Sequence, residues 1–265
     1  MKKTSLFVAL MLIAVIGAST ASFAACTATS LTTAPGVWGL EAYGHNGSGV
    51  LVNDLIQATF ASGGAFTGTE WESVGGTVTG PTTISGTWAM VSPAADCQGT
   101  ITVTSPSTQT FNFALNNTNK GLTLAQIDTG YTMGGFGVAQ GVIAGGACTN
   151  LMEKNKLFSL YSNGTIPLLG GLVTGTGELK FGTTGTTIVA LPTLTLDLGG
   201  AGNLISSGTG TSNLNSNCTG TGSLTATPGG TFDVDTVVVD GGKEMLFLVT
   251  SANGGPANVS GYFLQ

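Results

Sequence analysis

The sequence predicts an all-β protein built from two tandem antiparallel modules. Three observations support this: a composition rich in glycine and poor in charge, a cysteine spacing that occurs twice, and short segments in which apolar and polar residues alternate. Charged residues make up 8% of the chain and hydrophobic residues 42%. Because disordered chains combine high charge with low hydrophobicity, this chain is expected to fold. Its 43 glycines suit the turns and bulges of a β-protein.

Residues 1–24 have the three-part pattern of a secretory signal peptide. Lys2 and Lys3 precede an apolar run at residues 6–17, and small residues lead up to Ala24. The run is too short for a helix to cross a bilayer of about 30 Å, so we expect no transmembrane anchor. The pattern predicts cleavage after Ala24 and an extracytoplasmic location, in the periplasm, on the outer cell surface or in the medium.

Residues 23–26 also resemble a lipoprotein cleavage box, in which Cys26 would carry a lipid.

The four cysteines fall into two pairs with almost the same spacing. Cys26 and Cys97 are 71 positions apart, and Cys148 and Cys218 are 70 apart. Four cysteines allow three pairings, and a duplicated module selects Cys26–Cys97 and Cys148–Cys218. Disulfides suit an oxidising compartment, and each would close a loop whose constraint stabilises by about 4 kcal/mol in the chain-entropy model. The counterpart of Cys26 is Cys148, which cannot be lipidated, so the duplication favours disulfides in both modules.

Further matches at nearly the same offset support the duplication. Residues 96–100 resemble residues 217–221, and residues 110–113 resemble residues 231–234, both at an offset of 121. These registers predict a first module over residues 25–140, a linker over residues 141–147 and a second module over residues 148–265.

Alternating segments within each module predict short strands. Residues 100–104 alternate Thr with Ile or Val, and turn residues recur every eight to twelve positions. A module of this length accommodates about eight strands, enough to close a small barrel that side chains fill or that holds one small ligand. A β-sandwich remains open as the alternative fold.

Short motifs in both modules carry a resemblance. They are a Gly/aromatic first strand at residues 36–40 and 157–161, a Ser-Gly-Thr segment, and an Asp/Asn-Cys-x-Gly-Thr hairpin. With these motifs the chain resembles a poorly characterised group of secreted bacterial tandem β-barrel proteins, which in turn resemble lipocalin-type barrels. The resemblance implies two lipocalin-like barrels and no catalytic residues.

The predicted function follows from the barrel. Trp38, Trp88, Met90 and Phe113 are expected to line a barrel interior. We therefore predict a secreted, non-catalytic binding protein without a cofactor, which holds a small apolar ligand. The alternative is a structural or adhesive surface protein with solid barrels.

Few residues suggest nucleic-acid binding, metal binding or catalysis. Without residues 1–24 the chain has five lysines, no arginine and thirteen acidic residues, a net charge of −8 that argues against nucleic-acid binding. The single histidine, His45, lies in a glycine-flanked loop, and with disulfide-bonded cysteines it cannot form the usual zinc sets. No metal site is expected. Glu70 and Glu72 flank Trp71 and share a strand face, an arrangement that glycosidases can use, but no matching acids occur in the second module.

One strand is apolar on both faces. Residues 244–249 read Glu-Met-Leu-Phe-Leu-Val, and such a strand needs cover on both sides. We predict that one face enters its own barrel and that the face with Leu246 and Leu248 packs against the first module or another subunit, so that self-association through this face is a further expectation.

Overall fold

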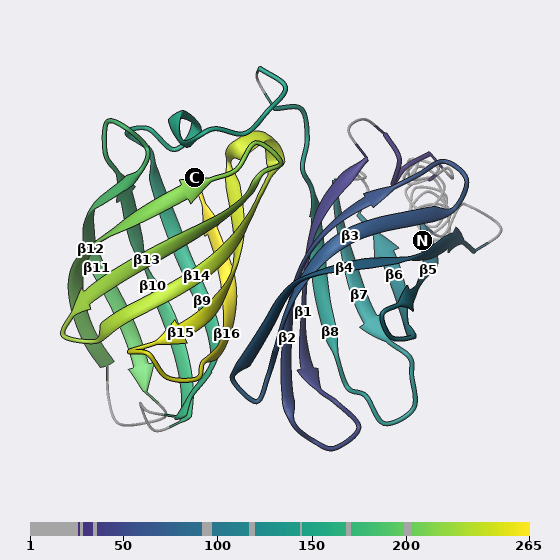
Figure 1. The fold of residues 1–265 in the computed structure, drawn as a ribbon, viewed down its shortest axis with the longest axis horizontal. Coiled ribbons are helices and arrows are strands. Elements are labelled where there is room, and N and C mark those ends of the chain that lie inside the picture. Colours follow the sequence, from purple (N-terminus) through teal and green to yellow (C-terminus); the bar gives the residue numbers. More distant parts are fainter. Residues whose placement is uncertain are drawn as a thin grey trace, which may run out of the picture.

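The computed structural model describes residues 26, 29–33, 36–91, 97–116, 120–143, 145–167, 171–198 and 203–265. The expected signal peptide at residues 1–24 lies outside the described residues. The described residues form sixteen strands in two closed barrels of eight (Figure 1).

The first barrel contains strands β1 to β8. Each strand pairs antiparallel with the next one along the chain, and β8 closes the barrel by pairing with β1. The strands are β1 (Val37–His45), β2 (Leu51–Phe60), β3 (Ala65–Val74), β4 (Thr77–Met90), β5 (Gln98–Ser105), β6 (Gln109–Leu115), β7 (Gly121–Gln126) and β8 (Gly134–Ala139).

The second barrel repeats this order with strands β9 to β16, and β16 closes onto β9. The strands are β9 (Leu157–Ile166), β10 (Gly171–Phe181), β11 (Thr187–Leu198), β12 (Asn203–Leu214), β13 (Thr219–Thr227), β14 (Gly230–Val239), β15 (Glu244–Ala252) and β16 (Asn258–Leu264). Two short 3₁₀ segments accompany it, η2 (Asn150–Met152) before β9 and η4 (Asp240–Gly242) between β14 and β15. The predicted fold class is therefore confirmed, and the sandwich alternative is excluded.

Both predicted disulfides are present. Cys26 is bonded to Cys97 and Cys148 to Cys218. Each bond ties the segment before the first strand of a module to the turn before the fifth strand, where Cys97 and Cys218 both adopt a positive φ, 53° and 71°. Because the sulfur of Cys26 is in a disulfide, it is not available for a lipid.

The backbone confirms the duplication at a second place. Gly44 in β1 and Gly164 in β9 have φ values of 156° and 157°. A Cβ at either position would lie 2.1 Å from a carbonyl oxygen of the last strand region of the same barrel, that of Thr132 or of Asn258. Only glycine permits this close approach of backbones, so both modules use it at the same point.

The interior of the first barrel is a packed apolar core. Trp38, Trp88 and Phe113 are buried in it, and Met90 is half-buried against it. The indole N–H of Trp38 donates to the carbonyl oxygen of Leu31 at 3.0 Å, and that of Trp88 to Ala61 at 3.1 Å. The structure thus places all four residues predicted to line a ligand site among core side chains. Whether they touch a ligand stays a prediction.

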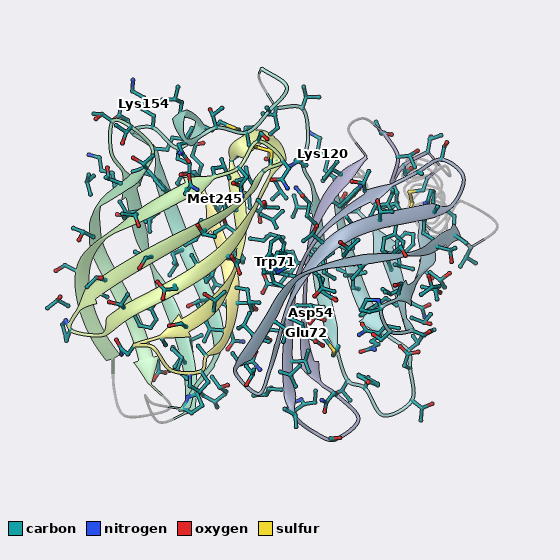
Figure 2. All side chains as sticks on the ribbon, viewed as in Figure 1. Asp54, Trp71, Glu72, Lys120, Lys154 and Met245 are labelled. Carbon is teal, nitrogen blue, oxygen red and sulfur yellow. A yellow bond between two sulfur atoms is a disulfide. The ribbon has the colours of Figure 1, made fainter. Side chains whose placement is uncertain are left out.

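The two barrels lie side by side and share an apolar interface (Figure 1). Its central side chains come from β2, β3, β14 and β15, and Figure 2 shows Trp71 between the barrels. The fully buried or nearly buried members are Leu55, Trp71, Val237, Val239, Leu246 and Leu248. Gly39 in β1 allows the closest approach, because a Cβ there would lie 2.6 Å from Cγ1 of Val239.

Strand β15 is buried on both faces, as its sequence predicts. Met245, Phe247 and Val249 point into the second barrel, whereas Leu246 and Leu248 contact the first barrel and have no exposed surface. The face proposed for self-association is therefore covered within one chain; self-association itself stays a prediction.

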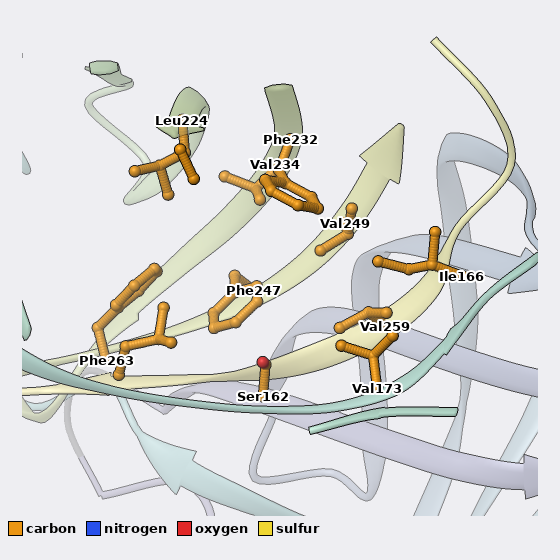
Figure 3. Close-up of a pocket in the computed structure, with 12 residues that line it drawn as sticks. Ser162, Ile166, Val173, Leu224, Phe232, Val234, Phe247, Val249, Val259 and Phe263 are labelled. Atoms are coloured by element: carbon orange, nitrogen blue, oxygen red, sulfur yellow. The ribbon is translucent and has the colours of Figure 1, made fainter. Parts of the chain in front are cut away.

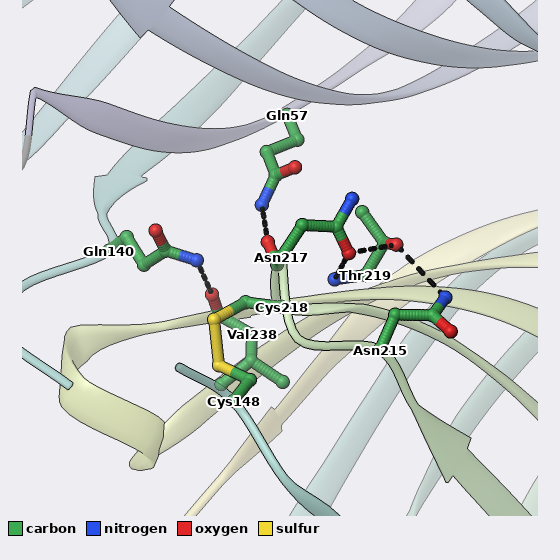
Figure 4. The surroundings of a disulfide bond; sticks show 8 residues. All are labelled: Gln57, Gln140, Cys148, Asn215, Asn217, Cys218, Thr219 and Val238. Atoms are coloured by element: carbon green, nitrogen blue, oxygen red, sulfur yellow. Dashed lines mark hydrogen bonds between the residues drawn. A yellow bond between two sulfur atoms is a disulfide. The ribbon is translucent and has the colours of Figure 1, made fainter. Parts of the chain in front are cut away.

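Side-chain hydrogen bonds also link the first barrel to the second. The Gln57 side chain donates to the carbonyl oxygen of Asn217 at 2.6 Å, beside the Cys148–Cys218 disulfide (Figure 4). The Ser73 hydroxyl donates to the carbonyl oxygen of Ala257 at 3.1 Å. Among the described residues, no helix has the length and apolar character needed to cross a membrane.

Candidate functional site

A small cavity lies inside the second barrel, between β9, β10 and β13 to β16. The cavity has a volume of about 50 Å³, enough for a few water molecules at most. Figure 3 shows the side chains around it, which are apolar except for Ser162. A ligand of the size that fills ordinary binding pockets does not fit this cavity.

A much larger space lies between the barrels. It has a volume of about 690 Å³, within the range of small-molecule sites. We call it the inter-barrel groove. Its lining residues are Glu41, Tyr43, Gly44, His45, Leu51, Asn53, Thr132, Gly134, Phe136, Tyr161, Asn163, Gly164, Thr165, Leu172, Asn258, Ser260, Gly261 and Tyr262.

The groove is built from the same part of each module. In the first barrel Glu41 is the register partner of Phe136, and in the second barrel Tyr161 is the register partner of Tyr262. With Gly44 equivalent to Gly164, position 41 therefore corresponds to position 161. By the same registers the equivalent pairs are Tyr43 with Asn163, His45 with Thr165, Leu51 with Leu172, Gly134 with Ser260 and Phe136 with Tyr262. Where the two residues of an equivalent pair differ, the two barrels contribute different side chains to the groove.

Three aromatic rings lie next to one another in the groove, and those of Tyr161 and Tyr262 are tilted by only 31°. The rings of Phe136 and Tyr262 pack edge to face across the two barrels, with centroids 6.1 Å apart. Tyr262 and Tyr161 lie 5.5 Å apart on adjacent strands. Tyr161 remains 39% exposed, so its ring is open to a ligand. Such a ring suits the flat face of another ring.

Glu41 is the buried acid of the groove. Its neighbours Leu40 and Ala42 face the interior of the first barrel, so Glu41 faces the second barrel, where it is only 3% exposed. Its carboxyl is hydrogen-bonded to the side chain of Ser260, and its Oε2 has no hydrogen-bond partner among the residues that the structure describes. Burial raises the pKa of Glu41 to about 7; the Ser260 hydrogen bond opposes this and the charge of Glu244 adds to it.

Asn258 is a second buried side chain with polar atoms that lack a partner among the described residues. It is 2% exposed, and neither its amide nitrogen nor its amide oxygen is hydrogen-bonded within the described part of the chain. A buried polar atom without a partner costs free energy, so Glu41 and Asn258 are places where a ligand would gain hydrogen bonds.

The residues singled out in the sequence have different positions. His45 lines the groove and is exposed. Glu70 and Glu72 lie on the opposite side of β3 from Trp71, which is in the barrel interface, so they face into the first barrel. There they accompany Asp54, the register partner of Glu72 (Figure 2). Burial, and then the charges of Glu70 and Glu72, raises the pKa of Asp54. Among the described residues, no group of three or more His, Cys, Asp or Glu side chains is placed to hold a metal ion.

The groove residues had no signature in the sequence. Glu41, Asn258 and Tyr262 belong to no motif, and Tyr161 ends the first-strand segment at residues 157–161, which carries no functional signal. The packing of the two barrels brings the four residues together. The one sequence feature that could have indicated the groove was Glu41, because it is a charged residue within the otherwise apolar run at residues 37–42.

Comparisons with known proteins extend the description of the fold. No family model matches the chain, and no curated protein sequence matches it. Among solved structures, the chain is similar to kievitone hydratase from Nectria haematococca, with 11% identity over 92% of this chain and 93% of that one and a TM-score of 0.30. The resemblance to secreted bacterial barrel proteins receives no support from these matches.

This match corrects one expectation. From the sequence we expected a protein that is not an enzyme, yet the chain matched here is that of an enzyme, kievitone hydratase. At this identity and TM-score the match transfers no activity, substrate or residue to the present chain.

Proposed function

We propose that the protein is an extracytoplasmic protein that binds a small, neutral, ring-containing molecule in the inter-barrel groove. The observation that carries this proposal is a space of about 690 Å³ that joins three aromatic rings to two buried polar side chains, Glu41 and Asn258, which have polar atoms without a hydrogen-bond partner among the described residues. The two disulfides support the location, since disulfides persist in oxidising compartments.

The lining chemistry favours a neutral ligand. No lysine lines the groove, and its acidic side chain is Glu41. An anion would find no lysine among the described residues of the groove, whereas a neutral ring with oxygen substituents can stack on Tyr161 and bond to Glu41 or Asn258. We place the ligand in the groove rather than inside the second barrel because the interior cavity has only about 50 Å³.

The second candidate is the structural or adhesive role in which the barrels are solid. The small size of the cavity described in the second barrel, about 50 Å³, and the apolar core around it favour this role. The two candidates differ in what they require of the groove, since a purely structural protein needs no ligand there.

Saturation-transfer NMR with a panel of neutral ring compounds, including monosaccharides and phenols, tests the binding function. We expect binding by compounds that combine a ring with oxygen substituents, and a loss of about tenfold or more in affinity in Tyr161→Ala. Tyr131→Ala is the matched control, because Tyr131 is 38% exposed, similar to Tyr161 at 39%, but lies outside the groove. No binding, or equal binding by both variants, would favour the structural role.

A further inference from the structure

Glu41 differs from the other acids of the chain in what surrounds it. Its carboxyl lies between the barrels, beside Leu55 and Phe136 on the neighbouring strands and opposite Ser260 of β16. At the equivalent position the second barrel has Tyr161 instead. The duplicated groove therefore has a carboxyl on one wall and a ring on the other.

Few charges face this carboxyl. Along β1 the titratable neighbours in the groove are Tyr43 and His45, and from β9 and β16 they are Tyr161 and Tyr262. The charge that acts on Glu41 is that of Glu244, at the start of β15.

The acidic residues of β2 and β14 do not face Glu41. Asp54 of β2 points into the first barrel, away from the groove, and Asp235 of β14 is separated from Ser260 by Leu248 in the strand register. Among the described residues no lysine lines the groove, so the ionised form of Glu41 has no lysine to stabilise it.

We propose that Glu41 is the specificity-determining residue of the groove: its protonated carboxyl donates a hydrogen bond to a carbonyl or ether oxygen of the neutral ligand, and loss of that proton releases the ligand. This inference rests on the proposed binding function and adds the ligand class and its dependence on pH.

Three features of the site support this role. Oε2 has no partner in the groove, so one position of the carboxyl is free for the ligand. Burial already raises the pKa of Glu41 to about 7. A ligand with an apolar ring displaces water from the groove, which penalises the ionised form further, and by linkage the ligand binds the protonated form more tightly.

Nile red is a suitable probe because it is neutral, has fused rings and carries a carbonyl acceptor. We expect its affinity for the wild-type protein to be constant below about pH 6 and to fall by up to about tenfold per pH unit above about pH 7, the limit for release coupled to one proton. Glu41→Gln keeps a hydrogen-bond donor at every pH, so its affinity should not depend on pH over this range. Glu178→Gln, at an exposed position of β10, is the matched control and should keep the wild-type profile.

A second variant tests the proton directly. The Ser260 hydrogen bond lowers the pKa of Glu41, so Ser260→Ala should raise it and shift the release of Nile red to higher pH. The ¹³C chemical shift of the Glu41 carboxyl, followed by NMR without a ligand, should titrate near pH 7 in the wild type and higher in Ser260→Ala.

The outcomes separate the two proposals. If Nile red binds the groove but its affinity is the same at all pH values, or if Glu41→Gln retains the wild-type profile, the role of Glu41 is wrong and the binding function stands. If Nile red binds at no pH, or binds Tyr161→Ala as tightly as the wild type, the neutral ring ligand and the groove function are both wrong. A Glu41 carboxyl that titrates near 4.5 would also overturn the role of Glu41.

Discussion

At the scale of single residues, the acids of this chain share an environment that favours their protonated forms. For seven carboxyl groups among the described residues, burial is the largest cause of a raised pKa. They are Glu41, Asp54, Glu70, Glu72, Glu153, Asp235 and Glu244. The chain has few lysines and no arginine to compensate them. The folded protein therefore retains protons that the unfolded chain releases.

The stability of the protein should consequently fall as the pH rises. For Glu41, Glu70 and Glu153 the folded pKa is about 7 and the ordinary value 4.5, so the folded state binds more protons between these limits. The free energy of unfolding should be highest below about pH 4.5, decrease on the order of a few kcal/mol up to about pH 7, and level off above. Urea unfolding at a series of pH values measures this.

Glu70→Gln removes one of these groups and should flatten the profile. Exposed Glu178→Gln should leave it unchanged. An unfolding free energy that rises with pH through the same window would show that these carboxyls are not buried as the structure has them.

At the scale of elements, β15 shows how sequence pattern leads to two-sided packing. Replacing Phe247 by Ser removes a ring from the core of the second barrel, and replacing Leu246 by Ser removes a side chain from the barrel interface. We expect each change to lower the free energy of unfolding by about 2–5 kcal/mol, because both side chains are buried and Ser also buries a hydroxyl. Leu264→Ser, at a 47% exposed position of β16, is the control. If only one of the two buried changes is destabilising, β15 packs on one face.

The elements also show where prediction from the sequence ends. Alternation predicted strands, the cysteine spacing predicted both disulfides, and the apolar run predicted the two faces of β15, because each of these depends on contacts within a module or on one strand. The groove depends on how two barrels are oriented. Glu41 and Asn258 are 217 positions apart and become neighbours of one space only after both barrels have closed and packed.

At the scale of the whole molecule, the apolar interface joins unlike faces of two similar barrels. Leu246 is the register partner of Tyr262, and its counterpart in the first barrel is Thr123, the partner of Phe136. Leu55 pairs with Glu41, and its counterpart in the second barrel is Thr176, the partner of Tyr161. Both threonines are exposed. Contacts between unlike faces can propagate into filaments, but at these two positions the apolar residue occurs in one barrel only, which disfavours a repeat of the same contact.

This interface should control the groove, because the two barrels form its walls. Gly39→Val places a side chain where a Cβ alone would lie 2.6 Å from Val239 and 3.1 Å from Leu246. Valine suits a strand, so the effect should arise between the barrels. We expect the free energy of unfolding to fall by about 1–3 kcal/mol, the radius of gyration to increase in small-angle X-ray scattering, and Nile red binding to weaken.

Gly63→Val, in a turn where a Cβ would meet nothing within 4 Å, is the control. If Gly39→Val keeps the wild-type radius and binds Nile red as before, the barrels do not meet at β1, and the groove between them is not the binding site.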